Sequence, residues 1–245
     1  MGFFKKSITI LCLFVIWIPT GISQSLTAQK VLQKSIKYHD PKGNWGRLTA
    51  TLNFDQDSPD NTAQKRSRKA IFNQPLNQFK MEQTRGEETI SRAVNGTECT
   101  NTFNGSTTFS EDIHKKYRLT CERAKMYRDY YSYLYGLPMK LKDPGTIIDS
   151  KVKEDIFQKK DCYSIRVTYD PKVGDDIWYF YFDKKTFALI GYRFYHEEAK
   201  NDGEYITLEG EETIGGIKMP KNRYWYYNKD DKYLGADLLL SLIHI

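Results

Sequence analysis

The sequence lacks the local residue patterns on which catalysis and metal binding commonly depend. Its 245 residues include four His and four Cys, and none of them stands at the H-x-x-x-H or C-x-x-C spacing of a zinc site. The G-x-S-x-G spacing of a serine nucleophile elbow is also missing. We therefore expect no metal, no cofactor and no enzymatic activity.

The hydrophobic run near the N-terminus is too short to span a membrane. The apolar run from Ile8 to Ile18 follows Lys5 and Lys6 and precedes small residues, which is the order of a secretory signal peptide. A membrane span needs about 20 residues, so we expect cleavage. Cys12 lies inside the run, away from the cleavage site, and does not predict a lipid-modified N-terminus. Residues 1–23 are thus predicted to be a signal peptide, and the product to be periplasmic or secreted.

The net charge is too small to indicate a nucleic-acid partner. The chain has 37 Lys and Arg residues against 31 Asp and Glu residues, a formal charge of +6. Without Lys5 and Lys6, which belong to the predicted signal peptide, the charge is +4. A balance of this size favours solubility, and we predict no nucleic-acid binding.

Three cysteines remain after removal of the signal peptide. Export places Cys99, Cys121 and Cys162 in oxidising surroundings, where pairing is favoured. Three thiols cannot all pair within one chain. Cys99 with Cys121 is the preferred pair, because Cys99 lies in a turn-rich stretch and Cys121 opens a helix nearby. The alternative, that all three are small buried apolar residues, stays open.

The periodicity of the apolar residues predicts two helices and many strands. Residues 25–39 have helical spacing, with Ser25 as N-cap, and YRLTCERAKMYRDYYSYLYGLP from Tyr117 predicts a second, central helix of about five turns. RLTATLNF alternates with the two-residue period of a half-buried strand. Further strands are expected at Ser67–Asn73, Asn77–Gln83, Glu88–Val94, Ile147–Phe157, Cys162–Tyr169, Ile177–Phe182, Phe187–Tyr195, Tyr205–Leu208, Arg223–Tyr227 and Ala236–Ile243.

The hairpin DDIWYFYFDKKTFALIGYRFY, at residues 175–195, has large apolar or aromatic side chains on both faces. A strand that is buried on both faces belongs in a covered sheet, and two helices cannot cover roughly ten strands. We therefore predict an apolar cavity beneath the helices. A one-residue register slip would exchange the two faces. The even-numbered face is the predicted cavity lining, namely Trp178, Phe180, Phe182, Ile190, Tyr192 and Phe194.

Two sequence stretches carry a resemblance to a known family. YFDKKTFALIGYRFY and GGIKMPKNRYWYY resemble the LolA/LolB-like lipoprotein-carrier superfamily, and the chain is similar from about Ala28 onward to secreted, uncharacterised relatives common in Bacteroidota. The resemblance implies an α+β fold of mostly antiparallel strands, with residues 24–245 forming one domain. Its expected architecture is an incomplete, half-open β-barrel of roughly ten or eleven strands covered by an N-terminal and a central helix.

We therefore expect an exported carrier or binding protein for an acyl chain, a lipid or a lipoprotein. Transient contact with envelope proteins or the membrane is a further expectation. Two alternatives remain. One is an envelope interaction or structural protein whose barrel is filled by its own side chains. The other is a hydrolase acting on an apolar substrate, which needs His39, His114 or His196 to point inward with a carboxylate partner.

Overall fold

The computed structural model describes residues 26–59 and 66–243. The predicted signal peptide, residues 1–23, lies outside the described residues. Within them no helix is long and apolar enough to cross a membrane.

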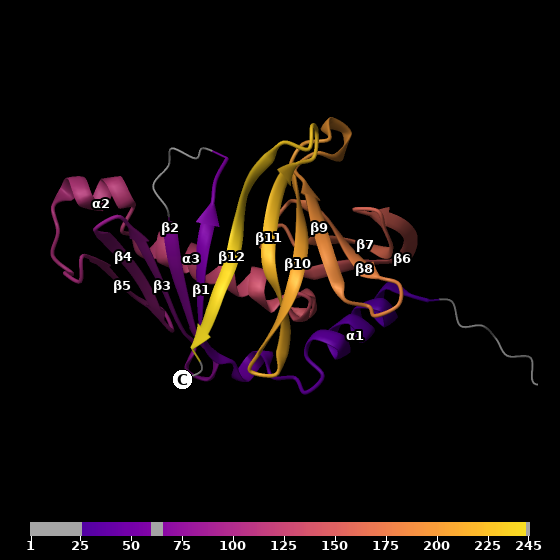
Figure 1. Cartoon of the computed structure of the whole chain (residues 1–245), viewed down its shortest axis with the longest axis horizontal. Helices are drawn as coiled ribbons and strands as arrows, with labels where there is room; N and C mark the ends of the chain where they lie inside the picture. The colour runs from indigo at the N-terminus through magenta and orange to yellow at the C-terminus, as the bar shows by residue number, and fades with distance from the viewer. Residues whose placement is uncertain (1–25, 60–65, 244–245) are drawn as a thin grey trace, which may run out of the picture.

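Twelve antiparallel strands form one open sheet in the order β5-β4-β3-β2-β1-β12-β11-β10-β9-β8-β7-β6 (Figure 1). The predicted half-open α+β architecture is confirmed, with twelve strands where ten or eleven were expected. The strands are β1 (Thr49–Asp57), β2 (Arg66–Asn73), β3 (Gln78–Arg85), β4 (Glu88–Asn95), β5 (Glu98–Phe103), β6 (Thr146–Phe157), β7 (Lys160–Tyr169), β8 (Ile177–Asp183), β9 (Leu189–Tyr195), β10 (Glu204–Ile214), β11 (Ile217–Tyr227) and β12 (Tyr233–Ile243).

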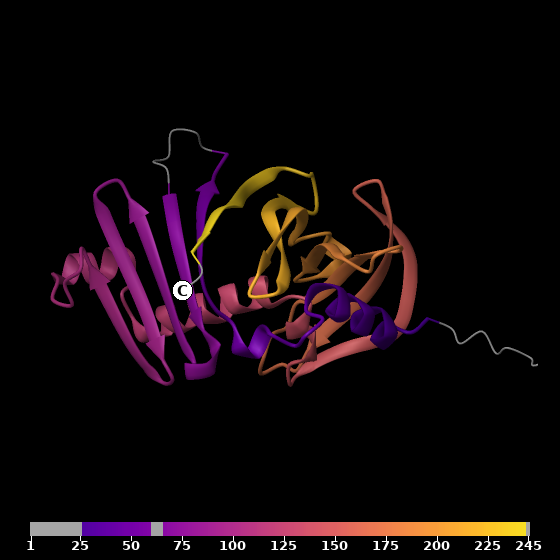
Figure 2. The ribbon, with the colours of Figure 1, turned by 60° about the horizontal axis from the view of Figure 1, so that its bottom comes forward.

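Two meanders make up this sheet. The first runs from β1 outward to β5; the chain then crosses to the opposite edge and returns from β6 to β12, which pairs with β1. The crossing segment contains α2 (Glu111–Tyr117) and α3 (Cys121–Gly136), while α1 (Ala28–His39) precedes the sheet. Figure 2 shows α3 lying across the concave side of the sheet. Four 3-10 turns complete the fold: η1 (Trp45–Arg47), η2 (Gln74–Leu76), η3 (Met139–Lys142) and η4 (Glu198–Lys200).

The strand alternation places the main core on the concave face. On β1, Leu52 and Phe54 are fully buried, and Phe54 lies opposite Leu239 of β12. Tyr131 and Tyr135 of α3 cover this region, with ring centroids 5.4 and 6.1 Å from that of Phe54. The helix and the central strands are thus held together by aromatic packing.

Two sequence predictions for β5 and the segment that follows it were wrong. The stretch from Glu98 to Phe103, expected to be turns, is strand β5. The predicted central helix begins at Cys121 rather than at Tyr117, because Arg118 adopts a left-handed conformation (φ 50°) that ends a separate, unpredicted helix, α2. Thr120 then caps α3 by accepting a hydrogen bond from the Arg123 backbone N–H. The polar residues of β5 gave no clear strand pattern, and the high helix propensity around Arg118 gave no sign of a break in the helix.

A disulfide between Cys99 and Cys121 joins edge strand β5 to the first residue of α3. The two Cα atoms lie 5.3 Å apart, and Cys162 is a buried free thiol. The preferred cysteine pairing is therefore confirmed, and the alternative of three unpaired cysteines was wrong. The bond fixes one end of α3 on the sheet, since a disulfide restricts the separation of the segments it links.

Helix α1 is attached to the sheet by His39, the last residue of the helix. Its Nδ1 lies 2.7 Å from the Lys218 carbonyl oxygen on β11, and its Nε2 accepts a hydrogen bond of 2.9 Å from the Leu189 backbone N–H on β9. These partners define a neutral imidazole protonated at Nδ1. Both ring nitrogens of His39 therefore bind backbone groups of the sheet and not the carbonyl oxygens of α1. Thr27, rather than Ser25, is the N-cap.

We predict that His39 makes stability decline in mild acid. Burial lowers the pKa of His39 below its ordinary 6.5, so the unfolded chain takes up this proton first. The His39 contribution is therefore complete above about pH 6.5 and is lost progressively as pH falls toward the folded-state pKa. His39→Gln, which retains a donor and an acceptor, should show a smaller loss of Tm between pH 7.5 and 5 than the wild type.

His196→Gln is the matched control for this experiment. The Asp176 carboxylate raises the pKa of the exposed His196, so its contribution is present at low pH and declines as pH rises, opposite to that of His39. Identical pH slopes for His39→Gln and the wild type would contradict the prediction.

Gly191 creates space for an aromatic stack on the convex face. The Phe157 ring stacks on Tyr181 with centroids 4.1 Å apart. A Cβ at Gly191 would lie 2.2 Å from the Phe157 ring and 2.8 Å from the Ile206 carbonyl oxygen. Only glycine allows this close approach without a shift of the backbone or the ring.

Gly191→Ala should therefore lower the free energy of unfolding by about 1–3 kcal/mol, because overpacking displaces the Phe157 ring. Urea denaturation measures the change. Gly46→Ala is the control, since a Cβ there meets nothing within 4 Å; equal stability losses for the two variants would refute the role of Phe157.

Candidate functional site

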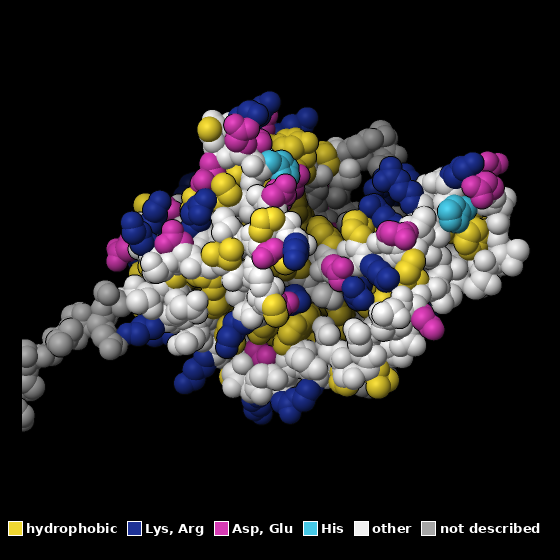
Figure 3. Space-filling model, turned by 180° about the vertical axis from the view of Figure 1, so that it is seen from behind, with side chains coloured by type: hydrophobic (Ala, Val, Ile, Leu, Met, Phe, Trp, Pro, Cys, Tyr) yellow, Lys and Arg dark blue, Asp and Glu magenta, His cyan; other side chains and the backbone are white. Residues whose placement is uncertain are grey.

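An open cleft of about 570 Å³ lies between the second half of α3 and the concave face of strands β7–β11. Seen from behind, the molecule shows hydrophobic side chains in hollows between groups of charged side chains (Figure 3). The cleft is lined by Asp129, Tyr130, Ser132, Tyr133, Leu134, Lys140, Asp143, Pro144, Thr146, Tyr169, Val173, Gly174, Asp176, Trp178, Tyr192, Phe194, Glu204, Ile206 and Trp225.

Aromatic side chains form one wall of the cleft. The Trp178 ring centroid is 4.9 Å from that of Phe194 on the neighbouring strand and 5.7 Å from that of Tyr133 on α3. The hydroxyls of Tyr133 and Tyr169 share a hydrogen bond. Burial raises the pKa of Tyr169 and of Tyr192 to about 12, so these phenols are neutral at physiological pH. The wall is apolar and uncharged as a result.

The predicted lining residues occupy three different environments. Trp178, Tyr192 and Phe194 line the cleft. Phe180 and Phe182 are on the same face but are fully buried in the main core. Their role in binding stays a prediction.

Ile190, the sixth predicted lining residue, packs on the opposite face. A bulge explains its position. Tyr181 lies opposite Gly191, whereas Phe182 lies opposite Leu189, so Ile190 has no partner in the ladder. The extra residue reverses the alternation, and Ile190 packs near Phe157 and Tyr181 on the convex face. The even-numbered face expected for this hairpin is thus interrupted before Gly191. Sequence alternation alone carries no signal for such a bulge.

Carboxylates at the cleft were missed by the sequence analysis. Asp143 pairs with Lys140, and Asp176 lies 2.6 Å from His196 Nδ1. Glu204 is partly buried, and this burial raises its pKa. The alternation of Glu204 with Ile206 and Leu208 along β10 is the signal that places its side chain on the concave face. Carboxyl groups therefore border one side of the cleft.

The three histidines named for a hydrolase do not share one environment. His196 has the Asp176 partner, but its side chain is 65% exposed. His39 is buried against backbone groups, and His114 lies on α2, where its ring stacks with Phe109. Among the residues that the structure describes, no three His, Cys, Asp or Glu side chains gather as a metal-binding group.

Two solved structures show which fold this is. A LolA superfamily protein from Nitrosomonas europaea matches with a TM-score of 0.54 at 12% identity, over 89% of this chain and 93% of that chain. A domain from Vibrio parahaemolyticus, which its name assigns to outer membrane lipoprotein sorting, matches with a TM-score of 0.51 at 8% identity, over 88% and 92%. The fold is LolA-like.

Sequence comparison adds a family. No curated protein is detectably similar in sequence. The model of DUF6503, described as a family of unknown function, matches residues 5–241, and the chain therefore belongs to that family.

Proposed function

We propose that the protein is an exported, non-catalytic carrier or binding protein that holds an acyl chain, as part of a lipid or lipoprotein, in the cleft beneath α3. The observation that carries this proposal is the aromatic wall around Trp178 and Phe194, which borders a cleft of about 570 Å³. Sites for small molecules typically have volumes of about 300–1,000 Å³ and mostly apolar linings. Exposed apolar surface of this kind is unfavourable in water, and an acyl chain would cover it.

The interior differs between the two halves of the sheet. Near β1–β3, Phe54, Phe72 and Tyr135 fill the concave face, with neighbouring centroids 6.1–6.2 Å apart. Near β8–β11, Trp178, Phe194 and Trp225 are only partly buried. The alternative of a barrel that is filled by its own side chains fits the region near β1–β3. It does not account for the cleft near β8–β11.

The LolA-like fold supports a carrier function, although fold alone does not determine activity. The predicted signal peptide supports a periplasmic or secreted location, where the Cys99–Cys121 disulfide is stable. In such a location the carrier would meet the membrane or envelope proteins transiently when it loads or releases its ligand.

Native mass spectrometry of protein purified without detergent tests the proposal. We expect either a co-purified lipid or saturable uptake of added palmitate. Palmitate uptake should change the fluorescence of Trp178 and Trp225, which provides a second measurement. Absence of both a bound lipid and saturable uptake would refute it.

Filling the cleft should prevent uptake. Gly174 lines the cleft, and a Cβ at this position meets nothing within 4 Å, so a side chain can be attached there without a clash at its Cβ. We expect Gly174→Trp to weaken palmitate binding by about tenfold or more, because the indole occupies space that the ligand needs.

Gly46→Trp is the matched control, because Gly46 also has open space around its Cβ but does not line the cleft. Fluorescence titration measures both variants. Unchanged affinity in Gly174→Trp would place the ligand elsewhere.

The two faces of the β8–β9 hairpin should differ in their effect on binding. Phe194→Ala removes part of the aromatic wall and should lower palmitate affinity by about tenfold, equivalent to about 1.4 kcal/mol. Ile190→Ala removes a side chain of the convex face and should leave affinity unchanged, even if it lowers Tm. Equal affinity losses in the two variants would contradict the assignment of the concave face.

A further inference from the structure

Three arginines surround the Tyr127 ring at the first half of α3. The guanidinium carbons of Arg68 on β2, Arg92 on β4 and Arg123 on α3 lie 5.5, 5.0 and 5.1 Å from the Tyr127 ring centroid. The Arg68 and Arg92 side chains lie on the same, concave face of the sheet, because the register of β2, β3 and β4 places them there. We call Arg68, Arg92, Arg123 and Tyr127 the arginine cluster.

Among the described residues, no carboxylate lies within ion-pair distance of the arginine cluster, and the buried Asp237 acts on Arg68 only over a longer range. None of the ion pairs within the described part of the chain involves its three guanidinium groups. Arg92 is only 4% exposed, and its Nε and Nη1 have no hydrogen-bond partner. Its Nη2 donates to the Tyr117 carbonyl oxygen at 2.6 Å. Arg68 Nε is likewise buried and unpaired. A buried charge in this state is costly unless a counter-charge is supplied.

The charges of the cluster act on one another. All three guanidinium groups oppose the burial effect at Tyr127 and lower the pKa of its phenol. Burial lowers the pKa of Arg92, and the neighbouring Arg123 and Arg68 lower it further. An anion would relieve this repulsion and fill the open hydrogen-bonding positions of Arg92, in the planar geometry that guanidinium groups provide for oxyanions.

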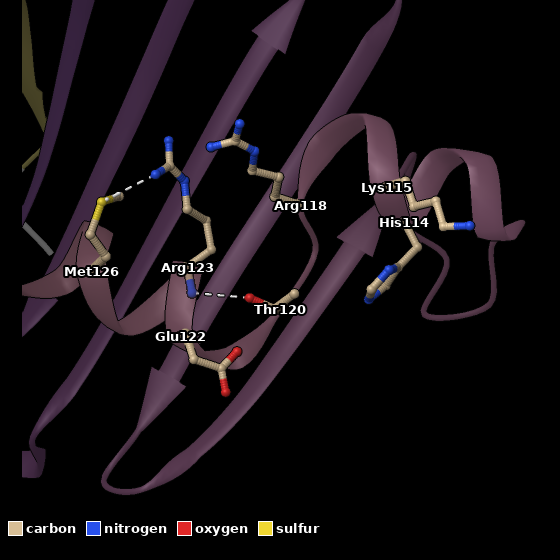
Figure 4. Close-up of a pocket in the computed structure, with 7 residues that line it drawn as sticks. All are labelled: His114, Lys115, Arg118, Thr120, Glu122, Arg123 and Met126. Carbon is tan, nitrogen blue, oxygen red and sulfur yellow. Dashed lines mark hydrogen bonds between the residues drawn. The ribbon is translucent and has the colours of Figure 1, made fainter.

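One member of the cluster, Arg123, also lines a second hollow beside α2 and the start of α3. Figure 4 shows that the side chains of Arg118 and Arg123 extend to the same side, away from Glu122. The hollow has a volume of about 520 Å³, and positive charge along its wall attracts anions. It is lined by His114, Lys115, Arg118, Thr120, Glu122, Arg123 and Met126.

We propose that Arg68, Arg92 and Arg123 bind an oxyanion, a phosphate or a carboxylate, and that this group is the head of the amphiphile whose chain occupies the cleft. Tyr127 and the cleft-lining Leu134 are about two turns apart on α3, roughly 10 Å along the helix axis, which is within the length of an acyl chain. The identification of the head group rests on the proposed carrier function, whereas the oxyanion site stands on the arginine geometry alone.

Two probes with the same chain and different heads test the site. Binding of dodecyl phosphate and of neutral dodecyl maltoside is measured by isothermal titration below their micellar concentrations. We expect Arg123→Gln to weaken dodecyl phosphate binding by about tenfold or more, since it removes a charge-assisted contact, and to leave dodecyl maltoside binding unchanged. Arg128→Gln is the matched control, because Arg128 lies on the same helix and pairs with Asp129.

A thermal-shift titration with inorganic phosphate separates the two sources of the oxyanion. Saturable stabilisation by phosphate that is lost in Arg123→Gln supports the site with a free oxyanion as occupant. Arginine-dependent binding of dodecyl phosphate alone supports it with a lipid head group. Binding of neither phosphate probe, or equal losses in Arg123→Gln and Arg128→Gln, overturns the inference. Failure of dodecyl maltoside and palmitate to bind, with phosphate binding retained, refutes the carrier function but not the oxyanion site.

Discussion

The position of α3 on the concave face determines which part of the interior is core and which part is cleft. The helix has 16 residues and is about 24 Å long, whereas twelve strands at a spacing of about 4.8 Å make the sheet about 50 Å wide. One helix therefore cannot cover the sheet. It is fixed at its start by the Cys99–Cys121 disulfide and near its end by Arg223, whose Nη2 donates to the Leu134 carbonyl oxygen at 3.0 Å.

The two ends of α3 present different chemistry to the sheet. At its start, the arginine cluster provides positive charge that no ion pair among the described residues neutralises. At its end, Trp178 and Phe194 provide an aromatic wall. Tyr131 lies between them, where its ring packs on Phe54 and its hydroxyl accepts a hydrogen bond from Arg68. A polar site and an apolar site on one helix match the two parts of an amphiphile, which a uniform core would not bind.

The apolar side chains on both faces of the β8–β9 hairpin do not by themselves require a cavity. On its convex face, Tyr181 is covered by Phe157 from the end of β6, and Tyr205 and Cys162 complete a second small core. Apolar residues on both faces therefore reflect two separate packing regions. The cleft follows from the partial burial of Trp178 and Phe194 on the concave face, not from the apolar convex face.

The sequence by itself determined the elements with clear periodicity, namely α1 and most strands, and the preference for the Cys99–Cys121 pair, whereas the half-open sheet was predicted from the resemblance to the LolA/LolB-like superfamily. The periodic elements depend on local alternation, helical spacing and spacing of turns, which the chain carries in each segment. Only the tertiary structure decided the break at Arg118, the strand β5, the bulge that turns Ile190 outward and the gathering of Arg68, Arg92 and Arg123. The arginine cluster depends on residues far apart in the chain, which strand register and the path of α3 bring together. The strand β5 and the bulge depend on pairing with a neighbouring strand, whose register the residue pattern of one segment does not encode.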